Sequence, residues 1–466
     1  EVIKRKGTAE DMHDYTMLAC MKNRVKVWEK DYKANADSIL NLSRKVTRLE
    51  SQLANRCKEY SDGTDFVNVD YDAVKQALGP NEVLIDFTDY ISQSQGRKYA
   101  AYIINKVQDY PLLKALFAES QIDSLGIVRP DMYYSEDYSE DVLKLLWEPL
   151  KEKVSEGATI YYVPSQLLFQ ISLESLPMPD GSLLGSHYHF VRLSSARELV
   201  KMKSNDSGSS EKSAVLYGGL QYDMETTAMT EESKKYDLSN LLAMRREIAR
   251  GDSIYHELQG TKEEILKIEN VLKRNKWKVT SYMGTNGTEE SFLNMHGKSP
   301  RLLHLATHGF YYSPSKAEKV DYLKGYTDAM SLSGIVLAGG NAAWLGKQLP
   351  NGVLGGILTA NDIARLDLNN TDMAVLSACQ TGQGKATAEG LYGLQRAFKK
   401  AGVGTIVMSL WSVSDMTTSE FMIAFYKCLA DKNNAWNKRK AFEQAKEIIR
   451  KKYPDPFRWA AFVMLD

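Results

Sequence analysis

The sequence predicts an α/β fold in which a largely parallel β-sheet is covered by helices on both faces. Two short apolar stretches, residues 301–309 (RLLHLATHG) and 373–384 (MAVLSACQTGQG), lack the polar alternation of half-exposed strands, so we expect both to begin as buried parallel strands. From residue 212 onward, segments typical of strands and helices alternate regularly, which indicates a doubly wound sheet. With 466 residues, of which 43% are hydrophobic, the chain can bury a large core.

Residues 1–62 are expected to form a helical segment. Apolar residues recur there at spacings of three and four, for example at Ile39, Leu42, Val46 and Leu49. One apolar stripe on each helix requires a partner surface. The segment is therefore either a helical hairpin packed on the following domain or the end of a helical repeat array, although no period of about 34 residues is visible.

Residues 63–204 are expected to contain both sheet and helices. EVLIDFTDYI and KYAAYIIN indicate a hairpin, and SEDVLKLLWEPLKEKV indicates an amphipathic helix with Ser139 as its N-cap. TIYYVPSQLLFQIS and HYHFVRLSSA indicate further strands, with His187 and His189 on one strand face. No nearby ligand completes a metal site around this pair, so we interpret both histidines as structural. The polar stretch 203–212 indicates a linker to the next domain.

Residues 212–466 show the regular alternation. The expected order is strand SAVLYGGL, helices around 240–250 and at 261–274, strand WKVTSYMG, a helix from Thr288, the two central strands, helix 388–401, strand GTIVMSLW, and helices 417–430 and 435–452.

His308 and Cys379 are the two side chains capable of catalysis that follow the central strands. Parallel strands place reactive groups at their carboxyl ends, and two strands joined by βαβ connectivity can be neighbours. An imidazole beside a thiol would then form a base and nucleophile pair. A single cysteine is often an inert core thiol, but Cys379 lies between an apolar strand and a glycine-containing loop that leads to a helix. That position favours a thiolate.

Several motifs resemble those of the CHAT-domain cysteine peptidases, which share the caspase fold of clan CD. The motifs are HLATHGF, GGILTANDIARLDL, VLSACQTG, EGLYGLQRAF and SLWSVSD, and the terminal WAAFVMLD is similar to the last strand of that family. The resemblance implies that residues 63–204 are a non-catalytic caspase-like half and that residues 212–466 are the catalytic half. It also implies the His308–Cys379 dyad. CHAT domains often follow tetratricopeptide repeats, which agrees with a helical segment at residues 1–62.

Three other residues are assigned around this dyad. Gly309 has no Cβ, so its N–H can approach a scissile carbonyl and form an oxyanion hole with the N–H of Cys379. Glu389 is expected to support the catalytic loop or the following helix start. His304 is assigned a packing and hydrogen-bonding role, because a separation of four residues along a strand is roughly 13 Å, too far for it to share a metal with His308.

The resemblance also suggests where substrate specificity arises. Members of the clan build their first specificity pocket from loops that match GGLQYD and SLWSVSD, which contain Asp223 and Asp415. Two carboxylates there would favour a basic residue before the cleaved bond. Asp415 could equally cap the helix that begins near Thr417. Trp411 either forms a wall of the adjoining subsite or packs in the core.

We therefore interpret the chain as a cysteine endopeptidase that cleaves a protein partner after a basic residue through an acyl-enzyme. The alternative is a catalytically silent scaffold or regulatory module, but a scaffold does not need His308, Gly309 and Cys379 together. No cofactor is expected, since GQGKAT departs from the phosphate-loop pattern and no zinc motif is present. Residues 311–352 have few periodic signals and are expected to form a mobile cover over the site.

Composition limits the partners and location. The 59 basic and 59 acidic residues cancel, so no overall field favours nucleic acid or an anionic membrane. No apolar run reaches the length of a membrane span, and no signal segment opens the chain, which begins at Glu1 and is expected to be a piece of a longer protein. Four widely spaced cysteines argue against a disulfide framework. We expect a cytoplasmic protein whose N-terminal helices form a docking surface for a regulatory partner.

Overall fold

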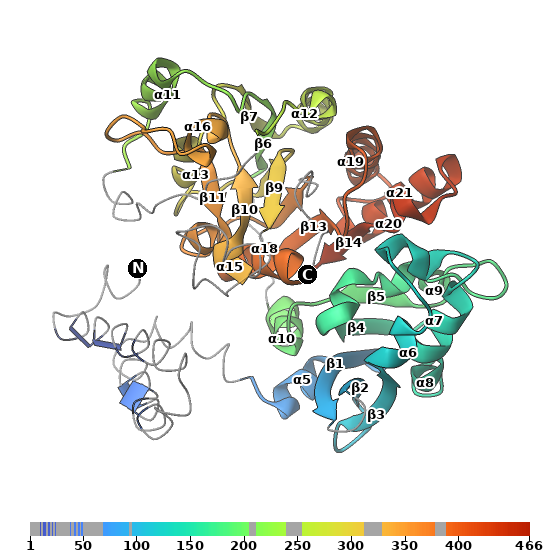
Figure 1. Ribbon diagram of the computed structural model, residues 1–466. Helices are drawn as coiled ribbons and strands as arrows, with labels where there is room; N and C mark the ends of the chain where they lie inside the picture. The colour runs from blue at the N-terminus through green and yellow to red at the C-terminus, as the bar shows by residue number, and fades with distance from the viewer. Residues whose placement is uncertain are drawn as a thin grey trace. The chain divides into compact units, whose positions relative to one another are not determined.

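The computed structural model describes residues 69–92, 96–204, 211–238, 254–311, 329–377 and 388–466, with isolated positions between residues 10 and 49 (Figure 1). These residues form two compact units. The smaller comprises Glu1–Ala77 and Leu199–Ser204, and the larger comprises Leu78–Glu198 and Asn205–Asp466. The expected helical segment 1–62 lies almost wholly outside the described residues and stays a prediction.

The larger unit is built on an 11-stranded sheet with strand order β3-β2-β1-β4-β5-β14-β13-β12-β8-β6-β7. Its strands are β1 (Glu82–Ser92), β2 (Gly96–Asn105), β3 (Leu112–Ala118), β4 (Thr159–Val163), β5 (His189–Arg192), β6 (Ser213–Leu220), β7 (Lys278–Gly284), β8 (Leu302–Leu305), β12 (Met373–Leu376), β13 (Thr405–Ser409) and β14 (Phe462–Leu465). The pairs β6–β7, β6–β8, β8–β12, β12–β13, β1–β4, β4–β5 and β5–β14 are all parallel. The predicted α/β class is confirmed.

Helices flank this sheet (Figure 1). Helices α12, α19 and α20 pack beside one another, and α18 packs with α15 and α17. The helices of the second half are α11 (Thr226–Ser233), α12 (Gln259–Arg274), α13 (Glu289–Leu293), α15 (Ala329–Leu332), α16 (Gly340–Trp344), α17 (Ala360–Ile363), α18 (Ala388–Lys400), α19 (Asp415–Ala430), α20 (Lys438–Lys452) and α21 (Pro456–Trp459). The expected helix around 240–250 lies outside the described residues. Among the described helices, none combines the length and apolarity needed to cross a bilayer.

The first half contains the predicted hairpin, in which β1 and β2 pair in antiparallel register. Its helices are α6 (Glu119–Asp123), α7 (Ser139–Leu146), α8 (Glu148–Lys151), α9 (Leu184–His187) and α10 (Ala196–Ser204), and α5 (Tyr71–Ala77) belongs to the smaller unit.

Two predictions of local structure in the first half are wrong. Ser139 is not the N-cap of its helix but its first residue; Tyr138 is the cap, and the helix is interrupted after Leu146 because Pro149 follows at the start of α8. His187 and His189 do not share a strand face, since His187 ends α9 and only His189 lies in β5.

Residues 311–352 are only partly described, and their described part is not a loose cover. Strand β10 (Ser333–Val336) pairs with β9 (His308–Tyr311) and with β11 (Ile357–Thr359) in a separate antiparallel sheet. Every residue from 332 to 344 is buried. This part is therefore core structure, and residues 312–328 lie outside the described residues.

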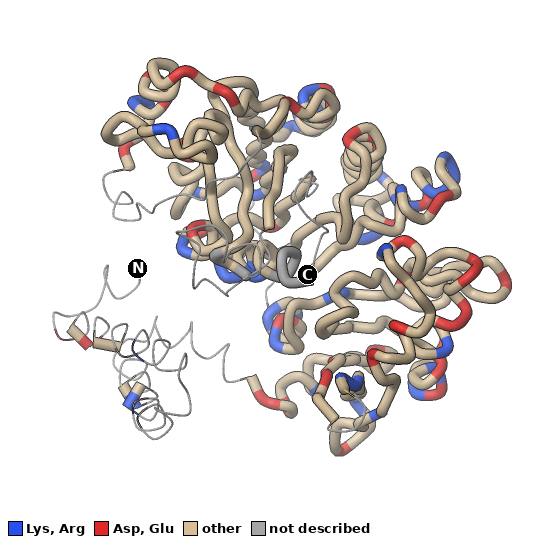
Figure 2. Tube along the Cα trace, viewed as in Figure 1, with Lys and Arg blue, Asp and Glu red and all other residues tan. Residues whose placement is uncertain are grey.

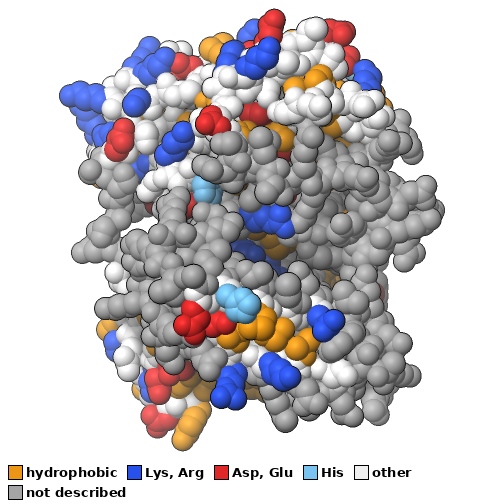
Figure 3. Space-filling model, turned by 90° about the vertical axis from the view of Figure 1, so that its left-hand side faces the viewer, with side chains coloured by type: hydrophobic (Ala, Val, Ile, Leu, Met, Phe, Trp, Pro, Cys, Tyr) orange, Lys and Arg blue, Asp and Glu red, His pale blue; other side chains and the backbone are white. Residues whose placement is uncertain are grey.

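Charged side chains are interspersed over the described surface. Figure 2 shows basic and acidic residues alternating along the helices and loops of the larger unit, and the face in Figure 3 carries small mixed groups of hydrophobic, basic and acidic side chains. This distribution agrees with a formal net charge of zero.

Candidate active site

The two central strands are neighbours, which βαβ connectivity permits but does not require. Strands β8 and β12 pair in parallel register, with Leu302 opposite Met373 and Leu305 opposite Leu376. Both strands therefore end at the same edge of the sheet. Cys379 follows β12 after Ser377 and Ala378 and lies outside the described residues, so its distance from His308 is not part of the structure.

Thr307 fixes the turn between β8 and β9. Its side chain is fully buried, and its hydroxyl donates a short hydrogen bond to the carbonyl oxygen of Val336 in β10. The same hydroxyl oxygen lies 2.9 Å from the hydroxyl of Tyr222, which donates to it because the proton of Thr307 is already used. The next residue, His308, is thus held at the junction of the main sheet and the small sheet.

His308 is buried, with 6% of its surface exposed. Its Nε2 lies 2.7 Å from the backbone carbonyl oxygen of His256. A carbonyl oxygen can only accept a hydrogen bond, so Nε2 carries the proton and Nδ1 is the basic nitrogen of the neutral ring. The imidazole also contacts two aromatic rings, at centroid distances of 4.9 Å to Tyr222 and 5.1 Å to Tyr255.

Burial determines the protonation state of His308. Loss of water around the ring lowers its pKa below the usual 6.5, whereas the His256 carbonyl and the Asp415 carboxylate oppose this shift by stabilising the imidazolium. The net direction is downward, so the neutral ring predominates at neutral pH. The pKa of Asp415 is raised by burial, and the positive charge of His308 counteracts that rise.

Asp415 and Asp223 have different surroundings. Asp415 is half-buried at the first position of α19, within electrostatic range of His308. It is not the helix cap, since the Ser414 hydroxyl accepts the N–H of Thr417 at 3.3 Å. The capping alternative for Asp415 is therefore wrong. Asp223 is exposed and directly follows Tyr222. A specificity pocket formed by both carboxylates stays a prediction.

Trp411 has the contacts of a packed core residue. Only 5% of its surface is exposed, and its indole N–H donates to the carbonyl oxygen of Phe457 at 2.9 Å. Its ring lies 5.8 Å from that of Tyr134. These contacts favour the packing alternative over a subsite wall.

His304 joins three elements in the interior. Its Nε2 lies 2.8 Å from a carboxylate oxygen of Glu264 in α12, and its Nδ1 lies 3.2 Å from the hydroxyl of Tyr426 in α19. Both His304 and Glu264 are buried. Within the described part of the chain, no group of three acidic, histidine or cysteine side chains could hold a metal ion.

The backbone positions of Gly309 and Glu389 do not test their assigned roles. Gly309 lies in β9 opposite Ile335 of β10, which places its backbone directly after the imidazole. Glu389 belongs to α18, but its side chain is outside the described residues. The oxyanion role of Gly309 and the supporting role of Glu389 stay predictions.

The sequence did not identify Tyr222, Tyr255 or His256 as site residues. Tyr222 lies in the GGLQYD segment, where only Asp223 was assigned, as part of a specificity pocket. His256 contributes a backbone carbonyl, and a backbone contribution leaves no side-chain signature in a sequence. Tyr222 directly precedes Asp223 in this segment, and that neighbouring position is the signal that could have identified it.

Comparisons with known proteins cover most of the chain. The family model of the CHAT domain matches residues 136–465. Tetratricopeptide repeat protein 28 from Mus musculus and from Homo sapiens is 32% identical over 111 residues, which is 23% of this chain and 4% of either relative. The chain therefore spans only a small part of these curated relatives.

Two solved structures show distant likeness. The complex of Porphyromonas gingivalis RgpB pro- and mature domains is 12% identical, with 70% of each chain covered and a TM-score of 0.39. The Saccharomyces cerevisiae separase–securin complex is 10% identical, with 98% of this chain and 27% of that chain covered and a TM-score of 0.34. Likeness at this level assigns no residue. The family match extends from before α7 to β14 and includes both His308 and Cys379, and it shows that the chain belongs to the CHAT domain family.

Proposed function

We propose that this chain is a cysteine endopeptidase that cleaves a protein partner, with His308 as the base and Cys379 as the nucleophile. The observation that carries the proposal is the hydrogen bond from His308 Nε2 to the His256 carbonyl, 2.7 Å long, in a buried site at the end of the central strands. That bond leaves Nδ1 as the basic nitrogen. Strand β12 pairs in parallel with β8 and ends at the same edge of the sheet, and Cys379 follows Leu376 by three residues in the sequence, which supports the proposed pairing with His308.

The proposed reaction uses one proton shuttle. His308 Nδ1 accepts the proton of the Cys379 thiol, and the thiolate attacks the scissile carbonyl carbon to form a C–S bond. The N–H groups of Gly309 and Cys379 stabilise the oxyanion of the tetrahedral intermediate. When the C–N bond breaks, the imidazolium of His308 gives its proton to the leaving amine. His308 then takes a proton from water, and the hydroxide forms a C–O bond with the acyl carbon. The C–S bond breaks, the carboxylic acid product leaves, and the imidazolium of His308 returns its proton to the Cys379 thiolate.

The electrostatics of the site support this sequence of steps. Burial lowers the pKa of His308 and so keeps the ring ready to accept a proton. Asp415 stabilises the imidazolium that forms after the transfer, since it acts on His308 in the opposite direction. The half-buried Asp415 carboxylate also supports a preference for Arg or Lys before the cleaved bond, because a bound cation would compensate its negative charge.

A cleavage profile against a peptide library tests the function. The wild type should cleave, whereas Cys379→Ala and His308→Ala should be inactive and folded. Cys428→Ala is the matched control, because Cys428 is a free cysteine in α19 outside the candidate site. Cleavage by Cys379→Ala would show that the dyad is misassigned. A folded wild type that binds a protein partner but cleaves no member of the library would favour the scaffold alternative.

A further inference from the structure

Asn341 connects the two segments that surround His308. Its side chain is buried, with 1% of the residue exposed, and lies at the second position of α16. Its Oδ1 accepts the backbone N–H of Tyr255 at 2.8 Å, and its Nδ2 donates to the backbone carbonyl of the same residue at 2.9 Å. The backbone N–H of Asn341 donates to the carbonyl oxygen of Tyr222 at 3.1 Å.

These bonds act on the immediate neighbours of the imidazole. Tyr255 precedes His256, whose carbonyl oxygen accepts the Nε2 proton of His308 at 2.7 Å. A side-chain amide that bonds both the N–H and the C=O of Tyr255 holds the two peptide units on either side of that residue. The ring of Trp344, from the same short helix, packs against Tyr255 at 5.0 Å and against Phe310 at 5.3 Å. The backbone around residue 255 is therefore held by both hydrogen bonds and packing.

We propose that Asn341 is a positioning residue for His308: by holding the Tyr255 backbone, it aims the His256 carbonyl at Nε2 and thereby keeps the basic lone pair on Nδ1. The inference rests on the proposed function, because the choice of nitrogen matters when Nδ1 must accept the thiol proton of Cys379. Within the described residues, the side chain of Asn341 bonds the backbone of Tyr255 and acts on the imidazole through it.

The physical reason is the choice between two neutral tautomers. Without a fixed acceptor, the proton of a neutral imidazole can occupy either nitrogen. A ring with its proton on Nδ1 cannot accept another proton there, so each molecule in that form is inactive as a base. If Asn341 is removed, the N–H and C=O of Tyr255 lose these partners and the peptide units on either side of Tyr255 can rotate. The His256 carbonyl, one peptide further along, then shifts away from Nε2.

The tautomer can be measured without any catalysis. The Cys379→Ala chain is labelled with ¹⁵N-histidine, and long-range ¹H–¹⁵N spectra are recorded; the chain has 7 histidines, and the His308 signals are assigned by their loss in Cys379→Ala/His308→Asn. The parent should show His308 as the Nε2–H form. Cys379→Ala/Asn341→Ala should show an averaged or Nδ1–H pattern.

Asn434→Ala is the matched control. Asn434 is also a buried asparagine, 3% exposed, that donates to a backbone carbonyl, that of Cys428 at 2.7 Å. It lies between α19 and α20, away from His308, so its loss should leave the His308 spectrum unchanged. A general effect of removing a buried amide would appear in both variants.

Kinetics give the second readout in the chain with Cys379 intact. Asn341→Ala should lower kcat by about tenfold or more with little change in KM, because the base is misaligned while the substrate site is retained. If neither the wild type nor Asn341→Ala cleaves any peptide, the proposed function fails, but the tautomer measurement still decides the role of Asn341.

The inference is overturned if a folded Cys379→Ala/Asn341→Ala chain keeps the His308 spectrum of the Cys379→Ala parent. Should that variant not fold, Asn341→Leu replaces it, since leucine fills a similar volume and makes no hydrogen bond. A folded Asn341→Leu chain with an unchanged Nε2–H signal would equally refute the positioning role.

Discussion

At the scale of single residues, the chemistry depends on how His308 is charged. A buried imidazole is neutral over a wider pH range than an exposed one, because the charged form loses its water. The Asp415 carboxylate works against burial and raises the pKa of His308. Burial and the Asp415 carboxylate both set the pKa of His308, so the pH dependence of activity reports on His308 and on Asp415.

We predict that Asp415→Asn moves the acid limb of kcat/KM to lower pH. In the wild type this limb should lie below the ordinary histidine pKa of 6.5, because burial lowers the pKa of His308. Removing the negative charge removes a stabiliser of the imidazolium, so the pKa falls further. The profile should be measured with an uncharged substrate. Asp431→Asn, at the other end of α19, is the control, and an upward shift in Asp415→Asn would contradict the assignment.

We predict that cleavage follows Arg or Lys and that Asp223→Ala lowers activity on an Arg peptide far more than on a Leu peptide. A charge-assisted hydrogen bond contributes about 1.5–3 kcal/mol, so its loss should reduce kcat/KM about tenfold or more. Asp415→Ala should lower the same preference, with an added effect on His308. Matched peptides with Arg, Asp or Leu before the scissile bond measure this. Faster cleavage after Asp or Leu would show that the acidic pocket is misassigned.

At the scale of secondary-structure elements, His304 links the central strand to two helices. It bonds Glu264 of α12 and Tyr426 of α19, and all three side chains are buried. The sequence indicated a packing and hydrogen-bonding role for His304 from its place inside an apolar strand. The partners could not be predicted, because they lie 40 and 122 residues away in the chain.

We predict that Glu264→Leu destabilises the fold less than His304→Leu does. In the second variant a buried carboxylate loses its partner, which costs about 3–5 kcal/mol. The double variant His304→Leu/Glu264→Leu should recover part of that loss. Urea unfolding of the wild type and the three variants gives the coupling free energy, and strict additivity would mean that the two side chains do not interact.

Most strands and helices were predictable, and the exceptions have local causes. Apolar runs such as LLHL and TIVMS have no polar alternation, so β8 and β13 were identified directly. Helix starts were less certain, since both Ser414 and Asp415 are suitable caps and the backbone geometry selects Ser414. Strand β10 was missed because its four residues become a strand through pairing with β9 and β11. Cys379 was identified from sequence, but its placement relative to His308 is not described.

At the scale of the whole larger unit, the two expected halves share one sheet. Strand β14 pairs in parallel with β5 of residues 63–204 and in antiparallel register with β13 of residues 212–466. The resemblance of WAAFVMLD to the last strand of the family predicted a strand there but not its place between the halves, which depends on long-range pairing. We therefore propose the two halves as parts of one folding unit rather than as independent domains.

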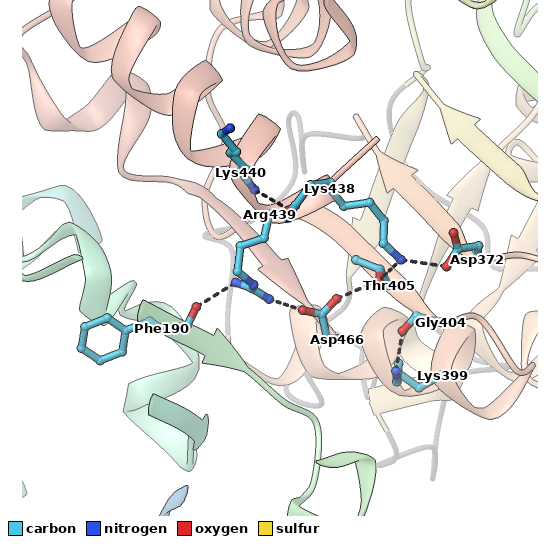
Figure 4. Close-up of polar contacts among 10 residues, drawn as sticks. Phe190, Asp372, Lys399, Gly404, Thr405, Lys438, Arg439, Lys440 and Asp466 are labelled. Atoms are coloured by element: carbon cyan, nitrogen blue, oxygen red, sulfur yellow. Dashed lines mark hydrogen bonds and ion pairs between the residues drawn. The ribbon is translucent and has the colours of Figure 1, made fainter. Parts of the chain in front are cut away.

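A polar network secures β14 at this position (Figure 4). Arg439 donates to the carbonyl oxygen of Phe190 at 2.8 Å and to the carboxylate of Asp466, which also accepts the hydroxyl of Thr405 at 2.8 Å. Lys438 bonds Asp372 at 2.7 Å. Burial alone would raise the pKa of Asp466, but Arg439 and Lys438 outweigh it and hold the pKa below its usual value. The stabilisation is therefore present above the ordinary carboxyl pKa and lost as pH falls.

We predict that Arg439→Met lowers the stability of both halves together. Removing the cation leaves the Asp466 carboxylate, whose side chain is 16% exposed, less compensated. Because the site is not fully buried, the cost should be below the roughly 3–5 kcal/mol of a fully buried pair. Amide hydrogen exchange should show equal losses of protection in β4 and β8, because both strands belong to the sheet that β14 completes. Lys451→Met on the same helix is the control, since its side chain is 76% exposed and pairs with Glu447 of α20 itself. A loss confined to one half would show that the halves unfold separately.

The most direct test of the catalytic assignment is labelling by an electrophilic peptide that ends in arginine. The reagent forms a bond with an activated thiolate, and intact-mass analysis with peptide mapping identifies the modified residue. The wild type and Cys428→Ala should each gain one label, located on Cys379. His308→Ala should react at least about tenfold more slowly, because the imidazole that removes the thiol proton is absent. Labelling of another cysteine, or equal rates with and without His308, would contradict a His308–Cys379 dyad.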